Sequence, residues 1–220
     1  MMNKRVLLLC GHYGSGKTNI AVNLALAIKR EYPTVTLADL DIVNPYFRSK
    51  DSADELKEQG IRLICSNYAN SNVDIPALPP DLYALTDDRR MRAVIDVGGD
   101  DRGALVLGRL APSILEENDY EMLMVINCYR PLTRDAASTL EVMREIEVAG
   151  GIRFTALVNN SNLGVETTAA DVLASMRYAE EVANKSGLPV LMTTADERLK
   201  EELKDKIPNL FPLKLQKKIQ

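Results

Sequence analysis

One short segment of the sequence combines glycines, a lysine and a hydroxyl residue at a spacing that suits phosphate binding. Residues 11–18 read GHYGSGKT, which fits the pattern GxxxxGK[ST] of a P-loop. The glycines let the backbone curl so that consecutive N–H groups converge on phosphate oxygens at a helix N-terminus. Lys17 adds a positive charge at the β- and γ-phosphates, and the Thr18 hydroxyl can bind Mg²⁺. The predicted nucleotide-binding residues of this segment are Gly11, His12, Gly14, Ser15, Gly16, Lys17 and Thr18, with Lys17 also catalytic.

Three aspartates follow later apolar runs, where their carboxylates could serve Mg²⁺ and an attacking water. Asp96 ends the run RAVID, and the glycines after it place the Gly99 N–H where it could meet a γ-phosphate. Asp39 and Asp41 stand two residues apart, so an extended chain presents both carboxylates on one side. One of this pair could support the water shell of the metal, and the other could orient the attacking water. The structural alternatives are a strand-ending turn for Asp96 and ordinary loop acids for the pair.

Two further groups of charged or aromatic residues have both a functional and a structural interpretation. Arg102 could act as an internal arginine finger beside Asp100 and Asp101, or the three could form a solvated charge cluster. Residues 46–48, Tyr-Phe-Arg, follow Asp41 and could face a partner protein, because γ-phosphate ordering of such loops is a known switching device. Their alternative is simple packing against the edge of the sheet.

The stretch Asn159-Asn160-Ser161-Asn162 bears on which base is bound. GTPases commonly use an NKxD motif whose aspartate accepts two hydrogens of guanine, but the fourth position here is an amide. Asn159 could instead bond the adenine edge, because an amide offers both a donor and an acceptor. Asn at a strand end can also serve merely as a turn former. The missing carboxylate favours ATP.

Apolar runs and amphipathic runs alternate along the chain, and they predict the elements that position these residues. The runs that suit buried parallel strands are Arg5–Cys10, Thr34–Ala38, Ile61–Cys65, Ala93–Val97, Glu121–Asn127, Arg153–Asn159 and Pro189–Thr193. The helical patterns are Thr18–Lys29, Ser52–Gln59, Gly103–Glu116, Arg134–Ala149 and Thr167–Lys185. This repeat predicts an α/β fold, a mostly parallel sheet of about seven strands with helices on both faces. No composition break marks a second domain, so residues 1–220 are predicted to be a single P-loop nucleotide-binding domain, with 66–80 as a surface excursion.

Composition and charge exclude several other classes of protein. Hydrophobic residues make up 46% and charged residues 26% of the chain, which excludes general disorder. The net charge of −4 offers no overall basic field for nucleic acid, and the short basic tail with Lys214, Lys217 and Lys218 supports at most marginal membrane binding. The three cysteines lie far apart and no secretory leader is evident, so we expect a cytoplasmic protein without a zinc or iron–sulfur site.

Taken together, the P-loop, the Asp-x-Asp after the second predicted strand and the later DVGG make the chain resemble the MinD/ParA branch of P-loop ATPases, within the CobQ/CobB/MinD/ParA group. The resemblance also covers VINCYRPLTRDAASTLEVM and LPVLMTTADERLKE, and so most of the chain. It implies that Lys17 and Thr18 contact phosphate and Mg²⁺, that Asp41 positions the hydrolytic water, and that Asp39 and Asp96 support the metal. It also implies ATP bound between two subunits and partner binding that changes with hydrolysis.

One position departs from the family pattern. The family usually has a second lysine directly after the first glycine of the loop, reaching across the dimer to the phosphates of the partner. Here that position is His12, and a neutral imidazole cannot replace a permanent ammonium. His12 could also contribute only its backbone N–H, while Arg48 or Arg102 could supply a positive charge. The departure bears on ATP-driven dimerisation more than on nucleotide binding.

The sequence therefore supports three functions in order. The first is a Mg²⁺-dependent ATPase that acts as a nucleotide-state switch for a partner protein, with a possible ATP-dependent homodimer. The second is a small-molecule kinase or ligase of the same fold, which would need a dedicated second-substrate pocket. The third is a regulatory nucleotide-binding module with negligible turnover, which would bind ATP tightly without releasing phosphate.

Overall fold

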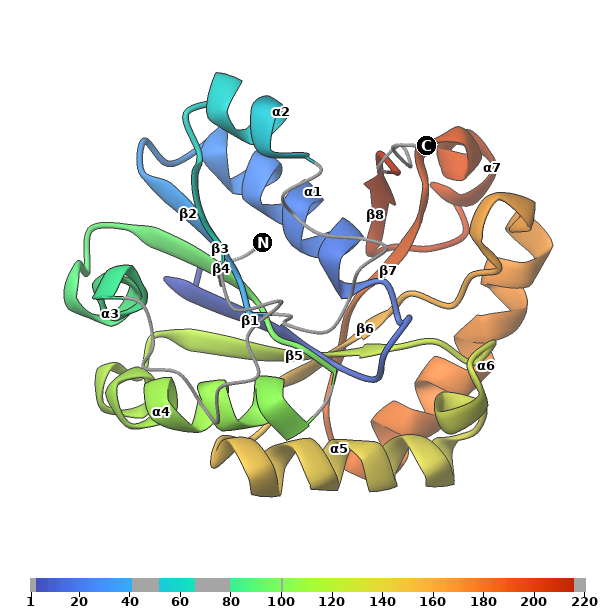
Figure 1. Ribbon diagram of the computed structural model, residues 1–220. Coiled ribbons are helices and arrows are strands. Elements are labelled where there is room, and N and C mark those ends of the chain that lie inside the picture. The colour runs from blue at the N-terminus through green and yellow to red at the C-terminus, as the bar shows by residue number, and fades with distance from the viewer. Residues whose placement is uncertain (1–2, 41–51, 66–79, 100, 216–220) are drawn as a thin grey trace.

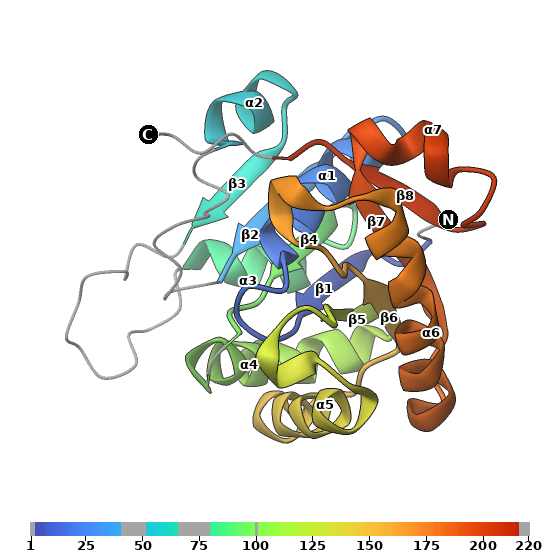
Figure 2. The ribbon, with the colours of Figure 1, turned by 90° about the vertical axis from the view of Figure 1, so that its right-hand side faces the viewer.

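The computed structural model describes residues 3–40, 52–65, 80–99 and 101–215. Their strands form one sheet in the order β3-β2-β4-β1-β5-β6-β7-β8, and every neighbouring pair is parallel (Figure 1). The strands are β1 (Val6–Cys10), β2 (Val35–Asp39), β3 (Arg62–Cys65), β4 (Arg92–Asp96), β5 (Tyr120–Ile126), β6 (Ala156–Asn159), β7 (Val190–Asp196) and β8 (Leu210–Leu213). Because all run in the same direction, the loops at their carboxyl ends gather at one edge of the sheet, which faces the viewer in Figure 2.

Helices cover both faces of this sheet. The α-helices are α1 (Lys17–Lys29), α2 (Ala53–Glu58), α3 (Pro80–Asp87), α4 (Asp101–Glu117), α5 (Ala136–Gly150), α6 (Ala169–Ser186) and α7 (Lys200–Leu203), and the 3₁₀ turns are η2 (Pro131–Thr133), η3 (Gly164–Glu166) and η4 (Glu197–Leu199). Helices α1 and α2 lie on one face, and α3, α4, α5 and α6 lie on the other (Figure 1). None of the helices in the described part of the chain has both the length and the apolar character needed to cross a bilayer.

Alternation along the central strand explains why two cores form. Leu7 and Leu9 of β1 pack in the same buried cluster as Ile20 of α1, whereas Leu8 packs with Leu107 of α4 on the opposite face. Successive side chains of a strand point to opposite faces, so a strand covered on both sides reads as a continuous apolar run. The predicted α/β fold with helices on both faces is confirmed.

The sheet has one more strand than the sequence predicted. All seven predicted strands are present, and β8 is added at the edge beside β7, with Thr193 opposite Leu210. Its Pro212 removes one backbone donor, which an edge strand tolerates because one side of it has no partner strand. Helices α3 and α7 were also not predicted, and most of the predicted surface excursion, residues 66–79, lies outside the described residues.

A buried ion pair fixes the end of the sheet opposite the P-loop. The guanidinium of Arg5, 4% exposed, is hydrogen-bonded to both carboxylate oxygens of Glu117 at the end of α4. It also donates to the carbonyl oxygens of Leu85 at 3.0 Å and Met91 at 3.1 Å. One side chain thus joins β1 to α3, to the start of β4 and to the end of α4.

Loss of this pair should destabilise the protein in a pH-dependent way. The variant Glu117→Gln is expected to lower the free energy of unfolding by about 3 kcal/mol at neutral pH, since it leaves the buried guanidinium without its charge partner. Hydrogen bonding from Arg5 holds the pKa of the Glu117 carboxyl below its ordinary value. The stabilisation is therefore complete above the unfolded-state pKa of about 4.3 and is lost as the pH falls through the lower folded-state value.

Urea denaturation of the wild type, Glu117→Gln and the exposed neighbour control Glu116→Gln, repeated from neutral pH to about pH 3, measures this effect. The gap between the wild type and Glu117→Gln should narrow in acid, while Glu116→Gln should follow the wild type throughout. A gap that stays constant with pH would show that the ion pair is not its source.

Candidate phosphate and magnesium site

A loop of left-handed glycines joins β1 to α1. Gly11, Gly14 and Gly16 have φ values of 146°, 74° and 90°, which residues with a side chain rarely adopt. A Cβ on Gly11 would also lie 2.5 Å from the carbonyl oxygen of Val125 in β5, and one on Gly16 would lie 2.2 Å from Nδ2 of Asn160. Both the backbone conformation and the close packing therefore require glycine at these positions.

The start of α1 is arranged to receive an anion. Gly16 occupies the N-cap, so no side chain caps the helix, and no acidic residue stands in its first turn. The N–H groups there and the positive end of the helix dipole are left to a negatively charged group. The hydroxyl of Ser15 is buried and has no hydrogen-bond partner among the described residues. Because such buried groups are rare, a phosphate oxygen bound in the loop would satisfy it.

The side chain of Lys17 curls back over the same loop. The residue is only 4% exposed, and its Nζ donates to the carbonyl oxygen of His12 at 3.4 Å. A buried ammonium is costly unless a negative group lies beside it. A phosphate held by the loop would supply that group, as predicted for Lys17.

The predicted metal-binding residues come together beside Lys17. Asp39 and Asp96 are register partners at the ends of adjacent strands β2 and β4, and both are buried. The hydroxyl of Thr18 in the first turn of α1 donates to Oδ2 of Asp96 at 2.6 Å. A hydroxyl and two carboxylates are the oxygen ligands that Mg²⁺ takes in nucleotide sites, together with phosphate oxygens and water, so these residues fit the ion.

Gly99 lies directly against the phosphate loop. A Cβ on this residue would lie 2.7 Å from the nitrogen of Tyr13 and 2.8 Å from the carbonyl oxygen of Gly11. The chain after β4 therefore needs glycine to approach the loop this closely. This places Gly99 at the loop, where the sequence predicted it.

Two other residues of the loop region have side chains turned to local partners. Nδ1 of His12 lies 2.9 Å from the carbonyl oxygen of Tyr13, which can only accept, so this nitrogen carries the hydrogen. Cys10, the last residue of β1, is buried, and burial raises the pKa of its thiol far above the ordinary value. The thiol beside the loop is therefore not a nucleophile.

The end of β6 contributes Asn160 to the loop rather than Asn159. The amide of Asn160 donates to the carbonyl oxygen of Ser15 at 2.6 Å and accepts from the hydroxyl of Thr194 at 2.6 Å. Asn159 is fully buried, and its amide donates to the hydroxyl of Ser175 at 2.9 Å and accepts from Ser161. The side chain predicted to meet adenine is thus committed within the fold, and its neighbour is the one that contacts the phosphate loop.

A cation that the sequence analysis did not select also reaches the loop. Nε of Arg130, in the turn after β5, donates to the carbonyl oxygen of Gly14 at 3.0 Å. The two residues are far apart in the sequence, so only a family alignment or a structure could have paired them. The only local signal is the Arg-Pro pair in CYRP, which fixes an extended residue before a turn.

Several predicted residues cannot be placed. Asp41 and residues 46–48 lie outside the described residues, as does Asp100. Arg102 is within α4, but its side chain is not among those the structure describes. The structure thus brings together the predicted phosphate-binding residues with Asp39, Asp96 and Gly99, and it does not place the residue predicted to orient water.

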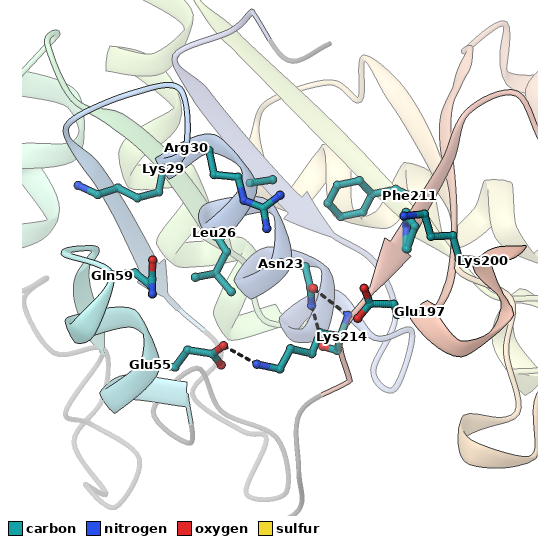
Figure 3. Close-up of a pocket in the computed structure, with 12 residues that line it drawn as sticks. Asn23, Leu26, Lys29, Arg30, Glu55, Gln59, Glu197, Lys200, Phe211 and Lys214 are labelled. Carbon is teal, nitrogen blue, oxygen red and sulfur yellow. Dashed lines mark hydrogen bonds and ion pairs between the residues drawn. The ribbon is translucent and has the colours of Figure 1, made fainter. Parts of the chain in front are cut away.

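A groove of about 630 Å³ lies on the α1 face, away from the phosphate loop (Figure 3). It is bounded by α1, α2, η4, α7 and β8, and its lining includes Asn23, Lys29, Arg30, Glu55 and Lys200. Figure 3 shows Lys214 crossing it to pair with Glu55 at 2.7 Å. Because an α-helix rises 1.5 Å per residue, Lys29 lies about 16 Å along the axis from Thr18. The groove contains none of the predicted site residues.

Comparison with known proteins identifies the fold. No protein-family model matches the chain, and no curated protein matches it. Among solved structures, it is similar to the cell division protein FtsY of Thermotoga maritima, with a TM-score of 0.56 and 19% identity, covering 90% of this chain and 65% of that one. It is also similar to the signal recognition particle receptor FtsY of Elizabethkingia anophelis in complex with GDP, with a TM-score of 0.53 and 16% identity, covering 88% and 58%.

A third similar structure is the signal recognition particle 54 kDa protein of Aeropyrum pernix in complex with GDP. Its TM-score is 0.51 and its identity 16%, covering 87% of this chain and 41% of that one. The chain thus spans between 41% and 65% of the length of these three proteins. At such identities the likeness concerns architecture alone. With the loop geometry above, it shows that the chain has the α/β fold of P-loop NTPases.

Proposed function

We propose that this protein is a Mg²⁺-dependent ATPase whose residues 1–220 form one nucleotide-binding domain. The observation that carries the proposal is the hydrogen bond of 2.6 Å from Thr18 to Asp96, which ties the start of α1 to a carboxylate on the neighbouring strand β4. A glycine loop alone fits many anions. A hydroxyl that shares its carboxylate partner at the mouth of that loop is the arrangement expected where phosphate and Mg²⁺ bind together.

The residues divide the work as follows. The backbone N–H groups of the loop, the Ser15 hydroxyl and Lys17 bind the β- and γ-phosphates. Thr18, Asp39 and Asp96 hold Mg²⁺, which neutralises charge on the phosphates when bound. Gly99 offers its N–H to the γ-phosphate, and Asp41 orients the attacking water.

The choice of ATP over GTP rests on the chain after β6. The fourth position of Asn159-Asn160-Ser161-Asn162 carries an amide, whereas recognition of guanine by an NKxD motif needs a carboxylate. The amide of Asn162 is also engaged locally, since it donates to the carbonyl oxygen of Asn160 at 2.7 Å and accepts from the N–H of Gly164 at 3.0 Å. Two of the similar structures hold GDP, so GTP is the competing ligand to test.

Isothermal titration calorimetry with ATP, ADP, GTP and GDP, each with and without Mg²⁺, tests the proposal. We expect binding of the adenine nucleotides, tighter with Mg²⁺, and weaker binding of the guanine nucleotides. Release of phosphate from ATP, followed over time, tests turnover. Tight binding of ATP without any phosphate release would favour a regulatory nucleotide-binding module, and preference for GTP would overturn the choice of base.

We further propose that the nucleotide state changes the surface shown to a protein partner, in the manner of the MinD/ParA branch, and that the protein works in the cytoplasm. Among the similar structures, FtsY of Elizabethkingia anophelis is described as a signal recognition particle receptor, so this fold is used by a protein with a macromolecular partner. Light scattering with ADP and then with a non-hydrolysable ATP analogue tests the possible homodimer. A doubling of mass with the analogue alone is the expected result, and a constant monomer mass would contradict it.

A kinase or ligase activity receives no support from the described cavity. Phosphoryl transfer needs an acceptor held beside the γ-phosphate. The groove along α1 lies about 16 Å further along that helix, too far for direct transfer. We therefore keep the ATPase as the proposed function.

Replacing Asp41 tests the proposed water-orienting role. The variant Asp41→Ala should bind ATP as the wild type does and hydrolyse it about 10² to 10³ times more slowly, because a positioned base contributes about that much. Single-turnover phosphate release, measured beside calorimetric affinity, separates the two effects. Equal hydrolysis by the variant would remove this role from Asp41 without affecting the binding site.

A further inference from the structure

We infer that Arg130 supplies the second positive charge of the phosphate site, within the same chain. The inference rests on the proposed nucleotide binding and deepens it. The P-loop has His12 where the family it resembles usually has a second lysine, and the ring of His12 is hydrogen-bonded to Tyr13. Arg130 reaches the loop from the turn after β5, where no loop lysine is needed.

The backbone of Arg130 is held in one place by buried polar groups. Its N–H donates to the carbonyl oxygen of Asn127 at 3.1 Å, and its own carbonyl accepts from the N–H of Thr133 at 3.1 Å. Asn127 and Thr133 are both fully buried, and the Thr133 hydroxyl donates to Asn127 at 2.7 Å. Pro131 restricts the residue before it to an extended conformation, and Arg130 has φ −111° and ψ 138°. The side chain therefore starts from a fixed point.

From that point the guanidinium lies along the phosphate loop. Its Nε is 3.0 Å from the carbonyl oxygen of Gly14, and a Cβ on Gly14 would lie 3.7 Å from Nε and 4.0 Å from Cζ. A guanidinium has five N–H donors in a rigid planar fork, so a bond from Nε leaves the four terminal donors free to meet a bound group. Such a fork matches the geometry of phosphate oxygens.

The charge of Arg130 is also free for a ligand. Within the described part of the chain it forms no ion pair, whereas Arg134, one turn later, pairs with Asp135 at 3.5 Å. The site already holds the carboxylates of Asp39 and Asp96, so a polyphosphate there needs more positive charge than Lys17 alone brings. A half-buried cation beside the loop meets this need.

Calorimetry with MgATP and with inorganic tripolyphosphate, at low and at high salt, tests the role of Arg130. We expect Arg130→Gln to bind both about tenfold or more weakly, and Arg130→Lys, which keeps the charge, to lose only a few-fold. The loss in Arg130→Gln should shrink at high salt, because the Arg130 charge is partly exposed and is screened. Arg134→Gln is the matched control, since it removes a neighbouring cation that makes no contact with the loop, and it should bind as the wild type does.

The outcomes separate this inference from the proposed function. A wild type that binds neither ATP nor tripolyphosphate overturns both. A wild type that binds, with Arg130→Gln binding equally well, overturns only the role of Arg130. Equal losses in Arg130→Gln and Arg130→Lys that do not change with salt, together with a lower thermal stability of both ligand-free variants, would show that Arg130 merely shapes the loop.

Discussion

Replacing Lys17 with Ala is expected to abolish detectable ATP binding, with a loss of affinity of at least about 100-fold. The ammonium is buried at the loop, so a bound phosphate would pair with it out of contact with most of the solvent. Removing one partner of a desolvated charge pair costs about 3 to 5 kcal/mol, and each 1.4 kcal/mol is a factor of about ten in affinity. Calorimetric titration with MgATP measures the effect.

Lys29→Ala is the matched control for this variant. Lys29 lies at the other end of the same helix, and its ammonium is hydrogen-bonded to the carbonyl oxygen of Pro33 rather than to the loop. This variant should bind ATP as the wild type does. Thermal denaturation of both variants shows whether they are folded. A folded Lys17→Ala protein with wild-type affinity for ATP would contradict the assignment of residues 11–18 as the phosphate site.

Replacing Asp96 with Asn should remove the dependence of ATP binding on Mg²⁺. The amide oxygen of Asn can still accept the hydrogen bond from Thr18, so the loop should keep its shape while the site loses one negative charge. Since Mg²⁺ is held in such sites by only one or two carboxylates, we expect a loss of about 10- to 100-fold in affinity for MgATP and little change for ATP in EDTA. Hydrolysis should fall more strongly, because the metal also neutralises charge that develops in the reaction.

Titrations with and without Mg²⁺ make this comparison, and Asp119→Asn is its control. Asp119 is a partly exposed aspartate that pairs with Lys4, just before the start of β5 at the opposite end of the sheet. It should leave both affinities unchanged. If Asp96→Asn kept the full advantage of MgATP over ATP, the carboxylate at the end of β4 would not belong to the metal site.

The phosphate loop shows how much of a site can be encoded locally. The residues from Gly11 to Thr18 are consecutive, and their function depends on backbone conformations that glycine alone adopts readily and on a helix that starts directly after them. The acidic residues Asp39 and Asp96 could be predicted almost as well. Each ends an apolar run, and parallel strands bring their carboxyl ends to one edge of the sheet, where the two became register partners.

Residues whose role depends on the phase of a strand were harder to predict. Asn159 and Asn160 are identical in type and adjacent, yet one points to Ser175 in α6 and the other to Ser15 in the loop. Successive side chains of an extended chain point to opposite faces, so an error of one residue exchanges the two roles. Strand β8 was missed for a related reason, because a four-residue edge strand with a proline has no periodicity to detect.

By itself, the sequence determined the α/β class, the strands that carry the site, the phosphate loop and the acidic residues at the ends of β2 and β4. These features follow from local spacing, apolar periodicity and the rule that parallel strands end on one side. Only the tertiary structure decided that Asn160 and Arg130 touch the loop and that Arg5 joins three elements at the opposite end. Those contacts join residues that are distant in the chain, and they depend on strand order and side-chain packing, which no local pattern encodes.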